Sequence, residues 1–220
     1  MDIERQIIRN DGFGVPCVML KPAYSSGAAV IVHGYGGCKE ELLGLAWRVA
    51  ESGITTCTID LRGHGEHPLP MDGGISKDVE AAIIYCRQFG KIIAIGHSLG
   101  GRLVLLSSAD FVIAISPALD QTFSEQTQKI VEDMRGYRVN KTTPSINFEI
   151  LHQLPTWRPG DGKPGLILVG TRDVPEIKRA CQDLKLQGVP VMEIGEALHN
   201  DIFLLEKTFC EVTRQMKIWL

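Results

Sequence analysis

Short apolar runs alternate with segments of helical period along most of the chain. Residues 28–37 (AAVIVHGYGG) begin as an almost continuous apolar run, which is typical of a strand buried on both faces of a sheet. Residues 39–53 (KEELLGLAWRVAESG) instead repeat apolar side chains at the spacing of one helix face and end at a glycine. By the same criteria we expect strands at 5–9, 14–22, 28–37, 54–65, 91–96, 111–117, 165–170 and 189–195. The expected helices are 39–53, 76–90, 99–108, 175–188 and one from about Asp201 to Leu220.

Repeated strand–helix units predict an α/β protein with a mostly parallel central sheet of about eight strands and helices on both faces. The first two strands are separated by Asn10-Asp11-Gly12, a turn signal that predicts a hairpin. A chain of 220 residues is long enough for one substantial core and short for two. We therefore expect a single domain over residues 1–220.

The alternation is interrupted between residues 120 and 163, immediately before the strand at 165–170. Thr122-Phe123-Ser124-Glu125 fits a capping box and predicts a helix to about Met134, closed by Gly136. The stretch from Arg138 to Pro164 holds four prolines and no clear period, so it is predicted to be irregular. We expect a small lid over the carboxyl edge of the sheet, where folds of this kind place their sites.

Ser98 lies between two glycines in the stretch IAIGHSLGG, where a strand pattern gives way to a helix pattern. A lone G-x-S-x-G arises easily by chance, but here a strand precedes it and a helix follows it. The alternative is an ordinary glycine-rich turn. A serine hydroxyl is a poor nucleophile at neutral pH, so a reactive serine requires a base and a group that orients the base.

The base and the acid are sought on loops that follow later strands. His199, in GEALHNDIF, is the only histidine after Ser98 that lies at such a position, whereas His97, inside the motif, is expected to point away from the serine. Asp173, in LVGTRDVP, follows a strand directly. Asp173 also fits a helix N-cap, with proline in the first turn and a glutamate three residues later. Both roles are compatible.

Four stretches of the chain together resemble the α/β-hydrolase-fold serine hydrolases of the esterase–lipase kind. They are VHGYGG, DLRGHGE, GHSLGG, and GTRD with ALHND, in this order. The resemblance covers nearly the whole chain except residues 120–163. It implies a triad of Ser98, Asp173 and His199, with the backbone N–H groups of Tyr35 and Leu99 as the oxyanion hole.

Two further groups of residues have open roles. Phe148, Leu151 and Trp157 either line an acyl pocket or anchor a long loop, while a helical stripe of Ile130, Met134 and Tyr137 is expected to pack against the core. In the loop from Asp60 to His67, two histidines lie near an aspartate and an arginine, but the resemblance implies a structural turn and no metal site.

Composition narrows the function classes. A net charge of −3 and the absence of a basic block give no electrostatic case for nucleic acid or an anionic membrane. No signal-peptide pattern and no long apolar run is found, so we expect no membrane contact. The six cysteines are widely spaced and are interpreted as free thiols, which favours a location in the reducing cytoplasm.

The sequence thus predicts a carboxylesterase-like serine hydrolase that acts on small-molecule esters of small-to-medium acyl groups. It uses an acyl-enzyme and needs neither metal nor cofactor. Thioesterase, peptidase and lactonase activities use the same machinery, and some proteins of this fold serve as small-molecule receptors. These alternatives stay open here.

Overall fold

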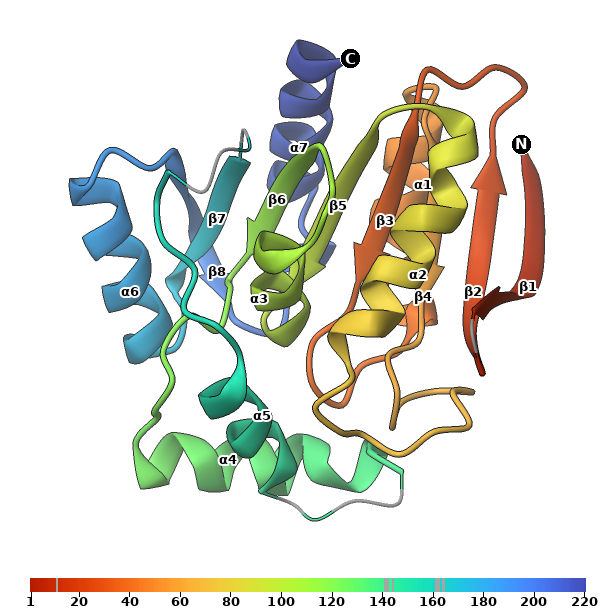
Figure 1. Cartoon of the computed structure of the whole chain (residues 1–220). Helices are drawn as coiled ribbons and strands as arrows, with labels where there is room; N and C mark the ends of the chain where they lie inside the picture. Colours follow the sequence, from red (N-terminus) through yellow and green to blue (C-terminus); the bar gives the residue numbers. More distant parts are fainter. Residues whose placement is uncertain (11, 141–142, 144, 161–162, 164) are drawn as a thin grey trace.

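Eight strands form one sheet in the computed structural model, which describes residues 1–10, 12–140, 143, 145–160, 163 and 165–220. In spatial order they are β1 (Asp2–Asn10), β2 (Phe13–Lys21), β4 (Thr55–Ile59), β3 (Ala28–Val32), β5 (Ile92–His97), β6 (Phe111–Ile115), β7 (Gly165–Arg172) and β8 (Val191–Leu198) (Figure 1). The hairpin β1–β2 and the pair β2–β4 are antiparallel, and the remaining neighbours from β4 to β8 are parallel. The predicted, mostly parallel sheet is confirmed. Asp11, in the predicted hairpin turn, lies outside the described residues.

Helices cover both faces of the sheet, as predicted. On one face lie α1 (Leu43–Glu51) and α7 (Glu206–Trp219); on the other lie α2 (Ser76–Cys86), α3 (Leu99–Leu106) and α6 (Pro175–Leu186) (Figure 1). Alternate residues of one strand point to opposite faces of the sheet, and each face has its own hydrophobic core. Val30 and Val32 of β3 therefore pack in one core, and Ala29 and Ile31 pack in the other. Short 3-10 turns are η1 (Lys39–Leu42), η2 (Arg87–Phe89), η3 (Gly136–Arg138) and η4 (Ile202–Leu204). The last of these separates α7 from Asp201, where a continuous final helix was expected.

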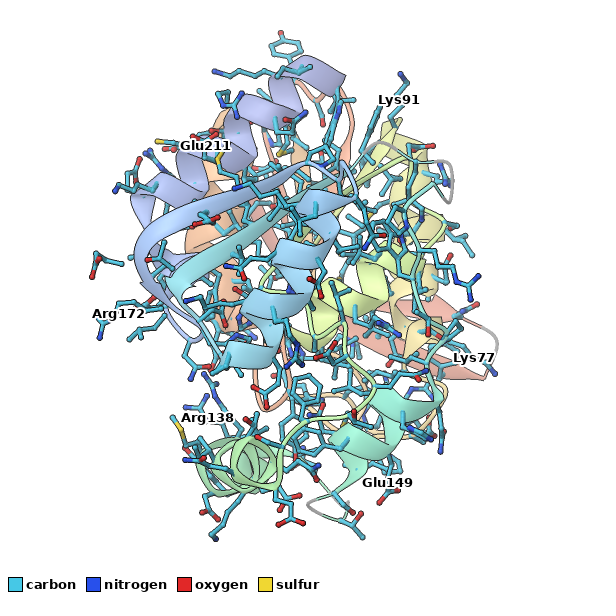
Figure 2. The ribbon with its side chains drawn as sticks, turned by 90° about the vertical axis from the view of Figure 1, so that its left-hand side faces the viewer. Lys77, Lys91, Arg138, Glu149, Arg172 and Glu211 are labelled. Carbon is cyan, nitrogen blue, oxygen red and sulfur yellow. The ribbon has the colours of Figure 1, made fainter. Side chains whose placement is uncertain are left out.

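The segment between β6 and β7 carries α4 (Glu125–Arg135) and α5 (Ile146–Gln153), which lie beyond the carboxyl ends of the strands (Figure 1). Figure 2, seen from the side, shows α4 nearly end-on with α5 beside it. The prediction of an irregular chain was wrong at α5, because the short helix has only Ile150 and Leu151 as buried apolar positions and the buried Asn147 masks its period. The predicted cap was also misplaced: Ser124, not Thr122, is the N-cap, and its Oγ accepts from the Thr127 N–H at 3.3 Å.

Within the described residues, no helix combines the length and apolar character that crossing a bilayer requires.

Candidate active site

Ser98 lies on a sharp turn between β5 and α3. Its backbone has φ 54° and ψ −114°, in the left-handed half of φ that side chains other than glycine rarely adopt. The flanking glycines are required by contact: a Cβ on Gly96 would lie 2.2 Å from the Gly100 carbonyl oxygen. A Cβ on Gly100 would lie 2.5 Å from the carbonyl oxygens of Val32 and His33. The turn therefore packs tightly against its surroundings and holds the serine in one direction.

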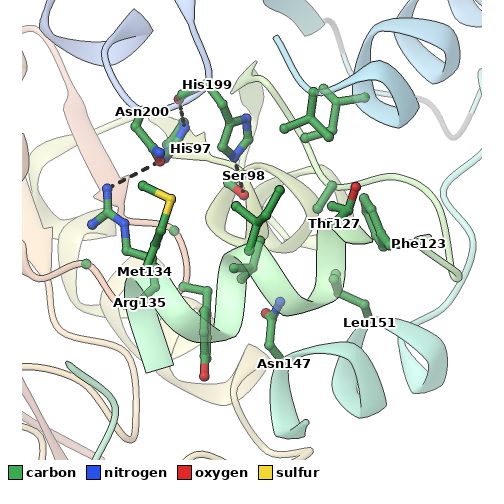
Figure 3. A pocket seen from close by; sticks show the side chains of 18 of the residues that line it. His97, Ser98, Phe123, Thr127, Met134, Arg135, Asn147, Leu151, His199 and Asn200 are labelled. Carbon is green, nitrogen blue, oxygen red and sulfur yellow. Dashed lines mark hydrogen bonds between the residues drawn. The ribbon is translucent and has the colours of Figure 1, made fainter. Parts of the chain in front are cut away.

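His199 lies between Ser98 and Asp173. Figure 3 shows its ring next to the Ser98 side chain. Its Nδ1 is 2.8 Å from Asp173 Oδ1, and its Nε2 is 3.0 Å from Ser98 Oγ. An ionised carboxylate only accepts hydrogen bonds, so Nδ1 carries the proton and donates it to Asp173. Nε2 is then free to accept the hydroxyl hydrogen of Ser98. This arrangement is suited to removing a proton from the serine.

Asp173 is buried at the turn after β7 and is well supplied with donors. Burial alone raises its pKa, but the hydrogen bond and charge of His199, with donors from Ser116 and Val174, hold the pKa of the carboxyl below its usual value. The Val174 N–H donates to Oδ1 at 2.7 Å, and the Ser116 hydroxyl donates to Oδ2. The carboxylate is therefore ionised around neutral pH. The capping role does not apply, because α6 begins at Pro175 with Val174 as its N-cap.

Two residues at this site were missed or misjudged from the sequence. His97 does not simply point away: its Nε2 lies 2.8 Å from the backbone carbonyl oxygen of His199, to which it donates. Its ring packs between those of His199 and Phe203, with centroids 4.9 and 4.6 Å away. Nothing in the sequence signals this contact. Ser116 was open to prediction, since it directly follows β6, whose carboxyl end neighbours that of β7.

The loop after β3 passes directly beside the serine. A Cβ on Gly34 would lie 3.0 Å from Ser98 Cβ and from His97 Nδ1, so any larger residue here would crowd the serine. The next N–H along the loop belongs to Tyr35, and the N–H of Leu99 follows the serine itself. Within the described part of the chain, neither N–H donates to a protein acceptor. Both groups are therefore available to an oxygen bound next to Ser98.

His33 and His64 hold this loop in place through hydrogen bonds to backbone N–H groups. His33 Nε2 accepts from the Leu61 N–H at 3.1 Å, and His64 Nε2 accepts from the Gly36 N–H at 3.0 Å. The Nδ1 atom of each ring lies 2.7 Å (His33) and 3.0 Å (His64) from a backbone carbonyl oxygen, to which it donates. Burial lowers the pKa of His33 to about 4, and burial together with the charge of His33 lowers that of His64 to about 3. Both rings are neutral at physiological pH.

The loop from Asp60 to His67 is a structural turn held by ion pairs. Asp60 accepts from Lys39 Nζ at 2.6 Å, and Arg62 pairs with Asp78 at 2.8 Å, all with buried side chains. Its charged groups thus already have protein partners. Across the residues that the structure describes, no three metal-ligating side chains gather in one place.

A cavity of about 210 Å³ opens at Ser98 and His199 (Figure 3). Phe148 and Leu151 of α5 line it. Trp157 does not: it lies apart, with Leu105 and Pro159, because the chain turns back toward β7 after α5. Its position fits the alternative role of anchoring the loop.

The stripe on α4 differs from its prediction. Ile130 and Met134 line the cavity and remain about half exposed, at 48% and 53%, while Tyr137 is 77% exposed. None of the residues in α4 is fully buried. Ile130 and Met134 therefore form part of the cavity wall, whereas Tyr137 lies in η3 outside that wall, and none of the three packs into the core.

The sequence model of the Alpha/beta hydrolase family matches residues 29–194. No curated protein matches the sequence. A hyperthermophilic esterase from the archaeon Pyrobaculum calidifontis superimposes with a TM-score of 0.70 and 20% identity, over 97% of this chain and 83% of that one.

Two further solved structures extend the comparison. Est1E from Butyrivibrio proteoclasticus gives a TM-score of 0.70 at 17% identity, over 96% of this chain and 97% of that one. E-2-(acetamidomethylene)succinate hydrolase gives a TM-score of 0.76 at 16% identity, over 98% of this chain and 100% of that one. At such identities the likeness concerns the fold.

Proposed function

Because the chain belongs to the alpha/beta hydrolase family, we propose that it is a serine hydrolase that cleaves carboxylic esters of small-to-medium acyl groups. Family membership by itself supports a hydrolase. The observation that carries the finer proposal is the continuous contact from Asp173 through His199 to Ser98, at 2.8 and 3.0 Å. The cavity volume of about 210 Å³ lies below the range of about 300–1,000 Å³ typical for drug-sized ligands, which favours small acyl groups.

The reaction proceeds in two halves. Ser98 Oγ attacks the ester carbonyl carbon while its proton passes to His199 Nε2, and Asp173 stabilises the imidazolium that forms. The bond to the leaving alkoxide then breaks, and the alkoxide takes the proton from Nε2. In the second half, water loses a proton to the same nitrogen and attacks the acyl carbon. Collapse of the second intermediate returns the proton to Ser98 and releases the acid.

The oxyanion that develops in each half needs donors fixed in advance. Two observations support the N–H groups of Tyr35 and Leu99 in this role: neither donates to an acceptor among the described residues, and Gly34 approaches Ser98 closely. Each such donor contributes about 3 kcal/mol to transition-state stabilisation in comparable sites.

The remaining expectations are part of the same proposal. Residues 120–163 act as a small lid, supported by the position of α4 and α5 over the cavity. The first turn of α4 is fixed to α6, since Glu176 Oε1 accepts from the hydroxyls of Ser124 and Thr127, each at 2.9 Å. A cytoplasmic location is supported by six free cysteines.

The test combines covalent labelling with turnover. The protein is incubated with a fluorophosphonate probe, the modified peptide is located by mass spectrometry, and hydrolysis of p-nitrophenyl esters of two to twelve acyl carbons is measured. We expect stoichiometric labelling at Ser98 and steady turnover with an optimum at short or medium chains. A Ser98→Ala variant serves as the control for both readouts.

The alternatives predict other results. Labelling at Ser98 without steady turnover favours a receptor or a hydrolase of another acyl class, which thioester, lactone and peptide substrates then separate. Absence of labelling in the folded protein contradicts the nucleophile assignment.

A further inference from the structure

The backbone of His199, whose ring contacts Ser98, is itself held by a side chain. The carbonyl oxygen of His199 accepts a hydrogen bond from His97 Nε2 at 2.8 Å (Figure 3). Among the described residues, no backbone N–H donates to this oxygen, which lies in the turn between β8 and η4. His97 directly precedes Ser98 in the chain. The serine and the histidine are therefore joined twice, once by their own side chains and once through His97.

The two contacts act on different parts of His199. The contact of Nε2 with Ser98 Oγ, at 3.0 Å, involves the end of the side chain. The contact with His97 involves the main chain, so it fixes the point from which the side chain extends. A displacement of about 1 Å at a reacting group lowers a rate by about 100-fold. A contact that fixes the main chain of the base therefore matters to proton transfer.

The His97 ring is in turn held on several sides. It belongs to the last residue of β5, a strand paired with β3 on one side and β6 on the other. The residue is 6% exposed, and its ring packs between those of His199 and Phe203, with centroids 4.9 and 4.6 Å away. The loop after β3 also passes close by, since a Cβ on Gly34 would lie 3.0 Å from His97 Nδ1. The ring therefore presents Nε2 in one direction.

The protonation state of His97 suits this contact. A carbonyl oxygen only accepts hydrogen bonds, so His97 Nε2 carries the proton that it donates. Burial and the neighbouring charge of His199 lower the pKa of His97 well below its usual value, so the ring is neutral and its single proton lies on Nε2. A neutral ring also places no positive charge against the imidazolium that forms on His199 when it takes a proton.

A second side chain contacts the same turn from α4. Arg135 donates to Asn200 Oδ1 at 3.3 Å, so this contact reaches the side chain of the next residue and not the main chain of His199. It also depends on the position of α4, whereas the contact from His97 starts on the strand that leads into Ser98. The bond from His97 is therefore the one that links the main chain of the base to the serine.

We propose that His97 is a positioning residue for the hydrolysis: its Nε2–H fixes the main chain of His199 and so keeps His199 Nε2 within reach of Ser98 Oγ. The assignment rests on the proposed function, because it concerns the reaction that Ser98 carries out there. His97 acts through His199 and makes no contact with the reacting proton. Loss of the donated bond should therefore lower kcat and leave KM nearly unchanged.

The test compares His97→Gln with His97→Met. The two new side chains have similar length and shape, but only glutamine can donate a hydrogen bond. The values of kcat and KM are measured with the p-nitrophenyl ester that the wild type hydrolyses fastest. We expect His97→Gln to keep kcat within about fivefold of the wild type, and His97→Met to lower kcat by about 30-fold or more with KM within about twofold. His152→Gln, at an exposed position of α5, is the control and should leave both values unchanged.

Two kinetic results overturn the assignment. One is a kcat of His97→Met within about threefold of the wild type, because the donated bond then has no effect on the reaction. The other is an equal fall of kcat in both variants, which shows that His97 supplies packing and that the donated bond is not needed.

A measurement on the wild type keeps the assignment testable if neither variant folds. In protein labelled with 15N-histidine, correlation spectra of the His97 ring at pH 7.5 should show the neutral form with its proton on Nε2. A proton on Nδ1 alone overturns the assignment, because Nε2 then has nothing to donate to the His199 carbonyl oxygen.

Failure of the proposed function gives a different result. In that case the wild type hydrolyses none of the p-nitrophenyl esters and Ser98 is not labelled by the fluorophosphonate probe, which overturns both proposals together. Labelling and turnover in the wild type, with equal kcat in the two variants of His97, overturn only the positioning role.

Discussion

Lowering the pH from about 7.5 to 5 should destabilise this protein well before its carboxylates are protonated. His33, His64 and His97 are each buried as the neutral imidazole, and burial lowers the pKa of all three. The first two are also locked by hydrogen bonds, because protonating Nε2 would set its N–H against the N–H of Leu61 or Gly36. The unfolded chain has no such constraint and takes up protons on these histidines first.

The magnitude follows from the pKa values in the two states. An unfolded histidine has a pKa of about 6.5, against about 4 for His33 and about 3 for His64 in the folded protein. The stability contributed by the neutral rings is therefore complete above pH 7 and is lost as the pH falls below 6.5. At pH 5 the loss is about 2 kcal/mol for each of these two histidines. Burial also lowers the pKa of His97 well below its usual value, so His97 contributes to the loss in the same direction.

The loss of about 4 kcal/mol predicted for His33 and His64 alone is a large part of the stability of a typical domain. The measurement is urea unfolding at half-unit steps between pH 5 and 7.5, with the free energy of unfolding plotted against pH. Near pH 5 the slope should reach at least about 2.7 kcal/mol per pH unit, which corresponds to the two protons that His33 and His64 take up on unfolding.

A variant separates the buried rings from general acid effects. His64→Gln keeps an oxygen that can accept from the Gly36 N–H but does not titrate, so the slope should fall by about 1.4 kcal/mol per pH unit. His152→Gln, at an exposed position of α5, is the matched control and should leave the slope unchanged. A free energy of unfolding that stays constant between pH 5 and 7.5 would refute the neutral, buried state of these histidines.

Three further predictions concern the catalytic machinery. Ser98→Ala should abolish steady ester turnover and leave the far-UV circular dichroism spectrum unchanged; turnover within tenfold of the wild type would assign the nucleophile elsewhere. Asp173→Asn should lower kcat by about 10⁴-fold, because an amide no longer selects the tautomer in which His199 Nε2 accepts a proton, and a loss below tenfold would point to another acid. Gly100→Ala should prevent folding or lower stability by at least about 3 kcal/mol in urea unfolding, since its Cβ would lie 2.5 Å from the His33 carbonyl oxygen; near-native stability would contradict the tight packing of the turn.

The strands of the sheet and the helices that cover it could be predicted from the sequence. Their local hydrophobic pattern matches the faces that they bury in the folded protein. The continuous apolar run at residues 28–32 has to be buried on both faces, and a strand between two neighbours is the way to bury it. The glycines around Ser98 are also a local signal, because a tight turn at this position leaves no space for a Cβ. The insertion was harder: α5 has two buried apolar positions and is held by packing over the cavity, so its period is weak.

Within the site, the order of Ser98, Asp173 and His199 along the chain, each after a strand, was enough to predict that they meet. The carboxyl ends of parallel strands reach the same edge, so residues far apart in sequence converge there. Contacts that depend on side-chain direction were not predictable. The donation from His97 to the His199 carbonyl oxygen required the packed structure.

By itself, the sequence determined the sheet, the turn that carries Ser98 and the three residues of the predicted triad, because hydrophobic period and glycine sterics are local properties. Only the tertiary structure decided which side chains face the cavity. It placed Phe148 and Leu151 on the wall and Trp157 away from it. These outcomes depend on how two segments approach each other across the edge of the sheet, and no pattern within either segment encodes that approach.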